Sequence, residues 1–301
     1  MAILIPPMVM SGIRDFLERD PFDEKAYKAY LLETKAENYV ISYLLLRDNK
    51  IIRTRINDDC KRFNNVNNLK YPPAESARTD RASLEGKPMF YGSIFTHQAD
   101  EIFLPRAISL METSEFFRDV NASGYQLITQ SVWRNNRDLR LAMLPVSELY
   151  KTPSDELMHM RREHKVYFPQ MNVGNIDEAT ILGDMFASPQ ERNTYNLTAH
   201  FVDYLLNESS EGDYFDGVVY PSVPSEGLGM NICIRKELID NGDVTCDGAC
   251  TELLIKHKKQ SKLAHLYDCN VTSDGTLDWR LADMLTMAVA NPALFSDLLF
   301  L

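Results

Sequence analysis

The sequence predicts an α/β (α+β) fold, in which helices cover a mixed, largely antiparallel sheet and an N-terminal helical extension precedes it. Three observations support this class. Residues 51–56 alternate in the manner of a strand. Two apolar stretches, 125–134 and 139–146, flank the turn-like pair Asn135-Asn136. Residues 191–207 repeat an apolar side chain every fourth position, which indicates an amphipathic helix.

The bulk composition is that of a globular protein with one main domain and terminal additions. The chain has 301 residues, of which 45% are hydrophobic, so it can bury a sizeable core without the help of disulfides. Its net charge of −11 excludes a general nucleic-acid binder, because such a protein presents a basic face. The charge is still compatible with a local basic pocket for an anionic ligand.

The cysteines and the N-terminus bear on the cellular compartment. Five cysteines are an odd count in a chain of this size, which favours a reducing compartment. Cys246 and Cys250 have CxxxC spacing, but no His or Cys pair follows at zinc-ligand spacing, so no metal site is expected. The run MAILIPPMVM lacks a basic region and makes a poor signal peptide, and no apolar run has the length of a membrane span. We expect a cytoplasmic protein without membrane or nucleic-acid partners.

The N-terminal part of the chain predicts helices and then a strand. Residues 11–47 carry apolar side chains near helical spacing after the N-cap candidate Ser11, so residues 1–48 are assigned to the helical extension. The strand at 51–56 follows. It places Ile52, Thr54 and Ile56 on one face and Arg53 and Arg55 on the other. A strand face with two arginines is either a solvated surface or the wall of a site.

The middle of the chain predicts a loop, a short strand and several helices. Residues 57–80 are rich in Asn and Pro, with few candidates for burial, which is typical of a loop. Residues 89–91 are a short apolar strand. A helix is expected from Pro105 onward, and it carries Glu112. Further helices are expected at residues 154–164 and 176–187.

The last part of the chain predicts more strands and a final helix. Strands are expected at residues 215–223, 231–238, 251–257 and 262–269, and residues 240–243 have hairpin-turn chemistry. Residues 281–301 are expected to be helical up to Pro292. The main domain is therefore assigned to residues 49–245. The hairpin and helix of residues 246–301 are expected to pack on that same domain.

The strongest candidate site lies in the stretch RTDRASLEGKPMFYGS, residues 78–93. It begins with two arginines in a polar loop and continues into a strand that contains Tyr91. A guanidinium binds phosphate as a planar fork, and a tyrosine ring offers a stacking face with a polar tip. The stretch therefore indicates an anionic, nucleotide-like ligand. The chain has no P-loop, Rossmann glycine fingerprint, GxSxG elbow or HExxH motif.

The order and spacing of several residues resemble the RES domain family, which is named for its arginine, glutamate and serine. Arg81 and Tyr91 stand ten residues apart, with a Gly and a Pro between them as in the family loop. Glu112 follows in the helical segment ISLMET. Ser222 lies in VVYPSVPSEGLGMNICI with Asn231 as the companion asparagine.

The likeness covers about residues 50–240, and it includes Arg53-Thr54-Arg55, which resembles the start of the first strand of the family. The gap from Tyr91 to Glu112 is longer than is usual in the family. This leaves Glu101 as an alternative acidic residue.

The resemblance implies a sheet of the ADP-ribosyltransferase-like type and an enzyme that degrades NAD⁺ without a prosthetic group, with residues 49–245 as the catalytic domain. Arg81, helped by Arg53 or Arg55, would bind the pyrophosphate. Glu112 would stabilise the positive charge that develops on the ribose. Tyr91 would stack on the nicotinamide or ribose, Ser222 would orient a polar group near the reacting carbon, and Asn231 would contact the substrate beside it. The family also implies a toxin that a helix-turn-helix antitoxin protein holds inactive, and homodimer formation stays open.

The primary expectation is thus an NAD⁺ glycohydrolase that releases nicotinamide and ADP-ribose. One alternative is a protein ADP-ribosyltransferase of the same fold, and another is a catalytically inactive domain that binds a nucleotide or a partner protein. Each side chain also has an ordinary structural interpretation. Loop arginines are commonly solvated, a strand tyrosine is commonly a core residue, and a serine after proline is commonly part of a turn.

Overall fold

A computed structural model describes residues 12–94, 103–151, 153–167, 176–189, 193–210 and 214–282. Within these ranges ten strands form one sheet in the order β1-β5-β6-β7-β3-β2-β4-β8-β9-β10. The strands are β1 (Ile41–Leu45), β2 (Lys50–Ile56), β3 (Met89–Ile94), β4 (Ser123–Asn135), β5 (Leu139–Met143), β6 (Gly217–Pro221), β7 (Met230–Arg235), β8 (Val244–His257), β9 (Gln260–Val271) and β10 (Leu277–Leu281). Strands β5 and β6 run parallel and the other neighbours antiparallel, which confirms the mixed, largely antiparallel sheet.

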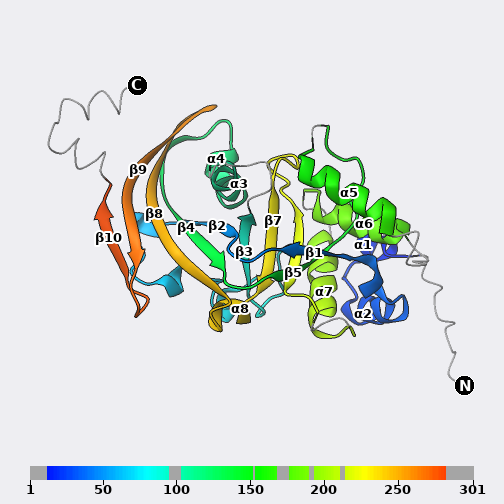
Figure 1. Cartoon of the computed structure of the whole chain (residues 1–301). Helices are drawn as coiled ribbons and strands as arrows, with labels where there is room; N and C mark the ends of the chain where they lie inside the picture. The colour runs from blue at the N-terminus through cyan, green and yellow to red at the C-terminus, as the bar shows by residue number, and fades with distance from the viewer. Residues whose placement is uncertain are drawn as a thin grey trace, which may run out of the picture.

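A narrow seam joins two halves of this sheet. The helical half contains β1, β5, β6, β7 and β3, and the curved half contains β2, β4, β8, β9 and β10 (Figure 1). At the seam β2 pairs with β3 only through Ile51↔Ile94 and Ile52↔Ser93. By contrast, β2 pairs with β4 over its whole length, and so does β3 with β7. Beyond Ile52 the two central strands therefore lack a common ladder.

Helices cover the helical half. They are α1 (Arg14–Glu18), α2 (Glu24–Glu33), α5 (Asp155–Tyr167), α6 (Ile176–Phe186) and α7 (Thr194–Asn207), gathered at one end of the molecule beside β1 and β5 (Figure 1). The predicted apolar stripe of α7 is confirmed, because Leu197, Phe201 and Leu205 are fully buried. Burial of each such side chain stabilises the fold by about 1.5–3 kcal/mol. This helix contacts α1, α2, α6 and β6, so it forms the centre of the main core.

Two helices lie over the curved half, on the concave side of β4 and β8 (Figure 1). They are α3 (Phe103–Thr113) and α4 (Glu115–Arg118). A small apolar cluster joins Leu110 of α3 to Ile128 and Leu254 of the sheet. The buried side chain of Lys256 donates hydrogen bonds to carbonyl groups at the end of α4, where the helix dipole favours a cation. These contacts fix the helix that carries Glu112.

Several predicted elements are confirmed. They are the strands at 51–56, 89–91, 125–134, 139–146, 215–223, 231–238, 251–257 and 262–269, and the helices at 154–164, 176–187 and 191–207, with shifts of a few residues at their ends. The loop at 57–80 contains only the short 3₁₀ turns Asp58–Cys60, Val66–Asn68 and Ala74–Ser76. The predicted turn at 240–243 follows a short helix, α8 (Glu237–Asp240), but the prediction of a hairpin there was wrong, because β7 pairs with β3 and β6 while β8 pairs with β4 and β9.

The prediction of helix throughout residues 11–47 was wrong at its end. Helix α2 stops at Glu33, Lys35 adopts a left-handed conformation (φ 50°), and one 3₁₀ turn (Ala36–Tyr39) leads into strand β1. Ile41 and Leu45 are both buried, and a spacing of four residues satisfies the period of a strand as well as that of a helix. This segment thus adds a strand to the sheet, paired with β5.

Three expectations fall wholly or partly outside the described residues. They concern Ser11 as an N-cap, Glu101 as an alternative acidic residue, and the helix at 281–301. Of that last segment, Leu281 is described and belongs to β10. None of the described helices has the length and apolar character that crossing a membrane requires.

Candidate functional site

A polar cavity of about 710 Å³ lies where β2 and β3 separate. Its wall is formed by the free part of β2, by β3, by the loop before β3, by α3 and by the start of α7. The predicted site residues among its lining are Arg53, Arg55, Arg81, Tyr91, Glu112 and Asn231. The seam of the sheet therefore brings together six of the seven side chains that the sequence singled out from stretches far apart in the chain.

Glu112 is held in this cavity by a chain of two hydrogen bonds. The amide Nδ2 of Asn231 donates to the Glu112 carboxylate (Oε1) at 2.6 Å, and the Ser93 hydroxyl donates to Asn231 Oδ1 at 2.8 Å. Ser93 and Asn231 are directly opposite each other on β3 and β7. Because the serine hydroxyl occupies the amide oxygen, the amide nitrogen is directed at the carboxylate. The carboxylate is thus held in position by a neutral hydrogen-bond partner.

Close packing lets α3 bring Glu112 down to the sheet. A Cβ atom on Gly229 would lie 1.8 Å from the end of the Ile108 side chain, so a larger residue just before β7 would force Ile108 to move. The buried Thr54 hydroxyl of β2 donates to the Ser109 hydroxyl of α3 at 2.9 Å. The helix is therefore tied to both sides of the seam.

Tyr91 organises the loop that precedes its own strand. Its hydroxyl donates to the Ser83 hydroxyl at 3.1 Å and accepts a hydrogen bond from the backbone N–H of Ala82 at 3.0 Å. Burial raises the pKa of Tyr91 well above its usual value, so the phenol is neutral at physiological pH. Its hydroxyl is thus engaged with the loop, while the residue still forms part of the cavity wall.

Arg81 is buried in the cavity wall, with 8% of the residue exposed. Its Nη1 donates to the carbonyl oxygens of Met185 (3.1 Å) and Phe186 (2.7 Å) at the end of α6, where the helix dipole favours a cation. The guanidinium also lies 5.2 Å from the centre of the Tyr195 ring. Nη1 also lies 3.1 Å from the Ser188 carbonyl oxygen, and Nη2 donates to the Tyr195 hydroxyl at 3.4 Å. Two of its nitrogens therefore serve the fold, although a guanidinium offers five N–H donors in all.

Arg53 and Arg55 hold the long loop beside the cavity. Arg53 donates to the carbonyl oxygens of Tyr91 (2.8 Å) and Leu69 (3.1 Å), and Arg55 donates to that of Asn68. Burial, and then the nearby charge of Arg55, lowers the pKa of Arg53 to about 10, so this group is still a cation at neutral pH. Both side chains line the cavity and give one part of its wall a positive charge.

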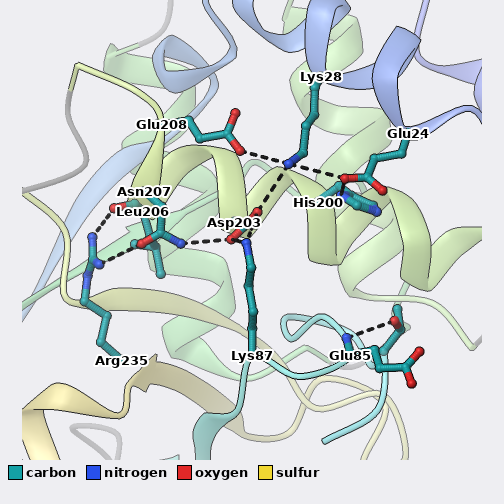
Figure 2. Close-up of polar contacts among 11 residues, drawn as sticks. Glu24, Lys28, Glu85, Lys87, His200, Asp203, Leu206, Asn207, Glu208 and Arg235 are labelled. Carbon is teal, nitrogen blue, oxygen red and sulfur yellow. Dashed lines mark hydrogen bonds and ion pairs between the residues drawn. The ribbon is translucent and has the colours of Figure 1, made fainter. Parts of the chain in front are cut away.

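An ion pair between an exposed lysine and a buried carboxylate anchors the far end of the Arg81 loop (Figure 2). Lys87, which lies just before β3, donates to both carboxylate oxygens of Asp203 on α7, at 2.7 and 2.8 Å. Asn207 donates to the same carboxylate at 2.9 Å, and Lys28 of α2 lies 3.6 Å from it. Burial by itself would raise the pKa of Asp203, but the hydrogen bonds from Lys87 and Asn207 and the charges of the two lysines lower it below the usual value. The loop is thus fixed at both ends.

Ser222 is the predicted site residue that the structure does not bring to the cavity wall. It follows β6, and its backbone N–H donates to the carbonyl oxygen of Gly229 at 2.8 Å. Its hydroxyl is fully buried and has no hydrogen-bond partner among the described residues. The nearby Tyr220 lines the cavity instead.

Several lining residues were not assigned to the site from the sequence, among them Ser93, Tyr195 and Tyr220. Ser93 lay at the end of the candidate stretch, but its role depends on a partner 138 residues away. Tyr195 stands in the first turn of α7, and no local pattern links it to the Arg81 loop.

Searches against protein-family models, curated proteins and solved structures found no match to this chain. The chemistry of the cavity itself is therefore what bears on function.

Proposed function

We propose that the cavity binds NAD⁺ and that the protein is an NAD⁺ glycohydrolase of the RES type. The observation that carries this proposal is the Glu112 carboxylate, fixed by the Asn231 amide beside a wall with several arginines. The opening of the sheet at the seam supports the ADP-ribosyltransferase-like type of fold that the resemblance implies.

The charge and size of the cavity suit a dinucleotide. The chain as a whole carries a net charge of −11, yet the charged residues that line this cavity include four arginines against three acids: Arg53, Arg55, Arg78 and Arg81, and Asp58, Asp80 and Glu112. Pyrophosphate is bound well by guanidinium groups because their planar forks match its oxygens. A volume of about 710 Å³ lies within the range of about 300–1,000 Å³ found for small-molecule sites.

The proposed reaction breaks the bond between the nicotinamide nitrogen and the ribose C1′. The bonding electrons leave with nicotinamide, which departs as a neutral base and needs no acid catalyst. The ribose then has oxocarbenium character, and the Glu112 carboxylate stabilises that positive charge. Water adds to C1′ and loses a proton, which gives ADP-ribose. The Asn231 amide contributes by holding the carboxylate in position without neutralising it.

Nicotinamide release from NAD⁺ by the purified chain tests the proposal. We expect Glu112→Gln to lower the rate by about 10²–10³-fold, since it removes the charge that stabilises the transition state. Glu115→Gln is the matched control, because Glu115 is an exposed glutamate in the first turn of the adjacent helix α4. A wild-type chain that releases no nicotinamide, or a Glu112→Gln chain as active as wild type, would contradict the proposal.

The fate of the ADP-ribose distinguishes hydrolysis from transfer. With NAD⁺ labelled in the adenylate part, a hydrolase leaves free labelled ADP-ribose. A transferase labels a protein band instead. Binding of NAD⁺ without any turnover, and with equal affinity in Glu112→Gln, would identify an inactive binding domain.

A further inference from the structure

A second cluster of reactive side chains lies on the β8–β9 ribbon of the curved half. Cys250 and Glu252 are two residues apart on β8, so they project from the same face. In the antiparallel register, Glu252 is opposite His265 and Cys250 is opposite Asp268. Cys250 and Glu252 are two residues apart, whereas their partners Asp268 and His265 are three residues apart. A register irregularity between Thr251 and Glu252 accommodates the extra residue of β9. The ribbon thus presents four polar side chains as neighbours.

Three of these side chains converge on one point. The thiol of Cys250, a carboxylate oxygen of Glu252 and a ring nitrogen of His265 all lie within 4.8 Å of one another. His265 Nδ1 is 3.6 Å from Glu252 Oε1. The donors of a tetrahedral zinc site are separated by about 3.2–3.9 Å, as follows from metal–ligand distances of about 2.0–2.3 Å. Small side-chain rotations therefore suffice to place all three around one ion.

Glu252 gives a second, independent indication of a missing ligand. Only 5% of the residue is exposed, and its Oε2 is buried without a hydrogen-bond partner among the described residues. An unpartnered carboxylate oxygen in the interior is costly, so such an atom normally faces a cation or a hydrogen-bond donor. Its other oxygen, Oε1, lies 2.6 Å from the Arg106 guanidinium. Oε1 is thus shared between Arg106 and the cluster, while Oε2 of the same carboxylate has no partner among the described residues.

The surroundings of His265 are those of a metal-binding histidine. Its Nε2 lies 3.0 Å from the Asp268 carboxylate, which favours a proton on Nε2. The lone pair on Nδ1 then faces Glu252. A carboxylate behind a ligating histidine is the usual outer-shell arrangement in zinc sites, because it fixes the tautomer and orientation of the ring.

Arg106 does not exclude a second cation, because the charges balance when the metal is bound. Its Nη2 lies 3.3 Å from the Cys250 sulfur as well as near Glu252. A zinc ion and Arg106 together carry three positive charges. A Cys250 thiolate, Glu252 and Asp268 carry three negative charges. A guanidinium beside a ligating sulfur can donate to it as an outer-shell hydrogen bond.

We propose that Cys250, Glu252 and His265 bind a zinc ion, with a water molecule in the fourth position. The sulfur, nitrogen and oxygen donors suit zinc and do not suit magnesium or calcium, which prefer oxygen alone. The site lies outside the NAD⁺ cavity and does not depend on the proposed activity. It would join β8 to β9, and through Arg106 it would hold the beginning of α3.

Metal binding by the full chain tests the site. Chelator-treated protein is titrated with zinc in competition with a chromophoric chelator, and separately with cobalt(II). We expect one zinc per chain at this site and a sulfur-to-cobalt charge-transfer band, which requires a thiolate ligand. Cys250→Ser should abolish the band. His265→Gln should weaken zinc binding by at least about 100-fold, because the loss of a direct ligand costs more affinity than the loss of a residue that only contacts a ligand. Asp268→Asn should weaken it by about 10–100-fold and keep the band.

Cys246→Ser is the matched control, because Cys246 is a half-buried thiol on the same strand outside the cluster. It should bind zinc and cobalt as wild type does. His265 is partly exposed, so its variant is expected to fold, and circular dichroism checks this. A wild-type chain that binds no zinc, a cobalt band that survives Cys250→Ser, or equal losses in Cys246→Ser and Cys250→Ser would each overturn the proposal.

Discussion

Helix α3 makes one contact with a carboxylate near each of its ends, and the two carboxylates have partners of different charge. Near its C-terminus Glu112 points at the neutral Asn231 amide, and near its N-terminus Arg106 contacts the Glu252 carboxylate of β8. Glu112 has a neutral amide as its partner. Glu252 has a part-exposed guanidinium that contacts one of its two oxygens. The difference lies in the partner: the amide positions a carboxylate without supplying an opposite charge, whereas the guanidinium supplies one.

The comparison is tested most strongly by giving Glu112 a charged neighbour. In Asn231→Asp, a second carboxylate would lie about 2.6 Å from the first, and the pair would then share a proton at neutral pH. We expect nicotinamide release to fall by about 10–100-fold, and its pH optimum to move upward because the pair ionises fully only at higher pH. The measurement is the rate of release as a function of pH.

Asn121→Asp, in the exposed turn before β4, is the control and should leave the pH profile unchanged. An Asn231→Asp chain with a lower rate but an unshifted optimum would show that Asn231 contributes shape alone.

The other end of α3 is tested by removing its charges. Glu252→Gln leaves the Arg106 guanidinium, only 28% exposed, without its anion, so we expect a loss of about 2 kcal/mol in the free energy of unfolding. The double variant Arg106→Met with Glu252→Gln should recover part of this loss, since neither charge is then left unpaired. Urea denaturation of chelator-treated protein measures both. Additive losses in the double variant would contradict an interaction between the two side chains.

The ion pair beneath the Arg81 loop gives a smaller, pH-dependent effect. Folding lowers the pKa of Asp203, so the folded state favours the carboxylate, and this stabilisation is present above the unfolded value of about 3.9 and is lost as the pH falls below it. Asp203→Asn should cost about 1–2 kcal/mol at pH 7, a figure kept low because Lys87 is 57% exposed. The difference from wild type should shrink as the pH falls below about 4.

Glu208→Gln is the matched control for that prediction. Glu208 pairs with Lys28 at 2.9 Å but is 35% exposed, so its loss should cost less than about 0.5 kcal/mol. Thermal unfolding of wild type and both variants between acidic and neutral pH makes the comparison. A pH-independent loss in Asp203→Asn would show that packing, and not charge, is what Asp203 contributes.

The sequence predicted the structure correctly where a feature depends on residues close together in the chain. The spacing of Arg81 and Tyr91, the alternation around Arg53 and Arg55, and the apolar stripe of α7 each depend on a few neighbouring residues. The last two predicted a strand and a helix that the structure contains, and the four named residues line one cavity. Strand β1 was misread because Ile41 and Leu45 fit two periods equally well. Local pattern could not predict which residues meet across the sheet.

Two pairings illustrate that limit. Ser93 reaches Asn231 only because β3 lies beside β7, and His265 reaches Glu252 only through a register shift in a hairpin. For the same reason Cys250 looked like half of an incomplete CxxxC motif, while its neighbours in space are Glu252 on the same strand and His265 and Asp268 on the opposite strand. Ser222 matched the expected position in the sequence but turned into the interior.

The seam between β2 and β3 has a mechanical consequence. Only two residue pairs connect the halves of the sheet there, so beyond them β2 and β3 are each hydrogen-bonded to a neighbouring strand along one edge alone. A molecule bound across the gap would supply cross-links between the two free edges. We therefore expect occupancy of the cavity to slow hydrogen exchange in Arg53–Ile56 and Met89–Gly92, so that the protein backbone itself reports ligand binding, whatever the ligand proves to be.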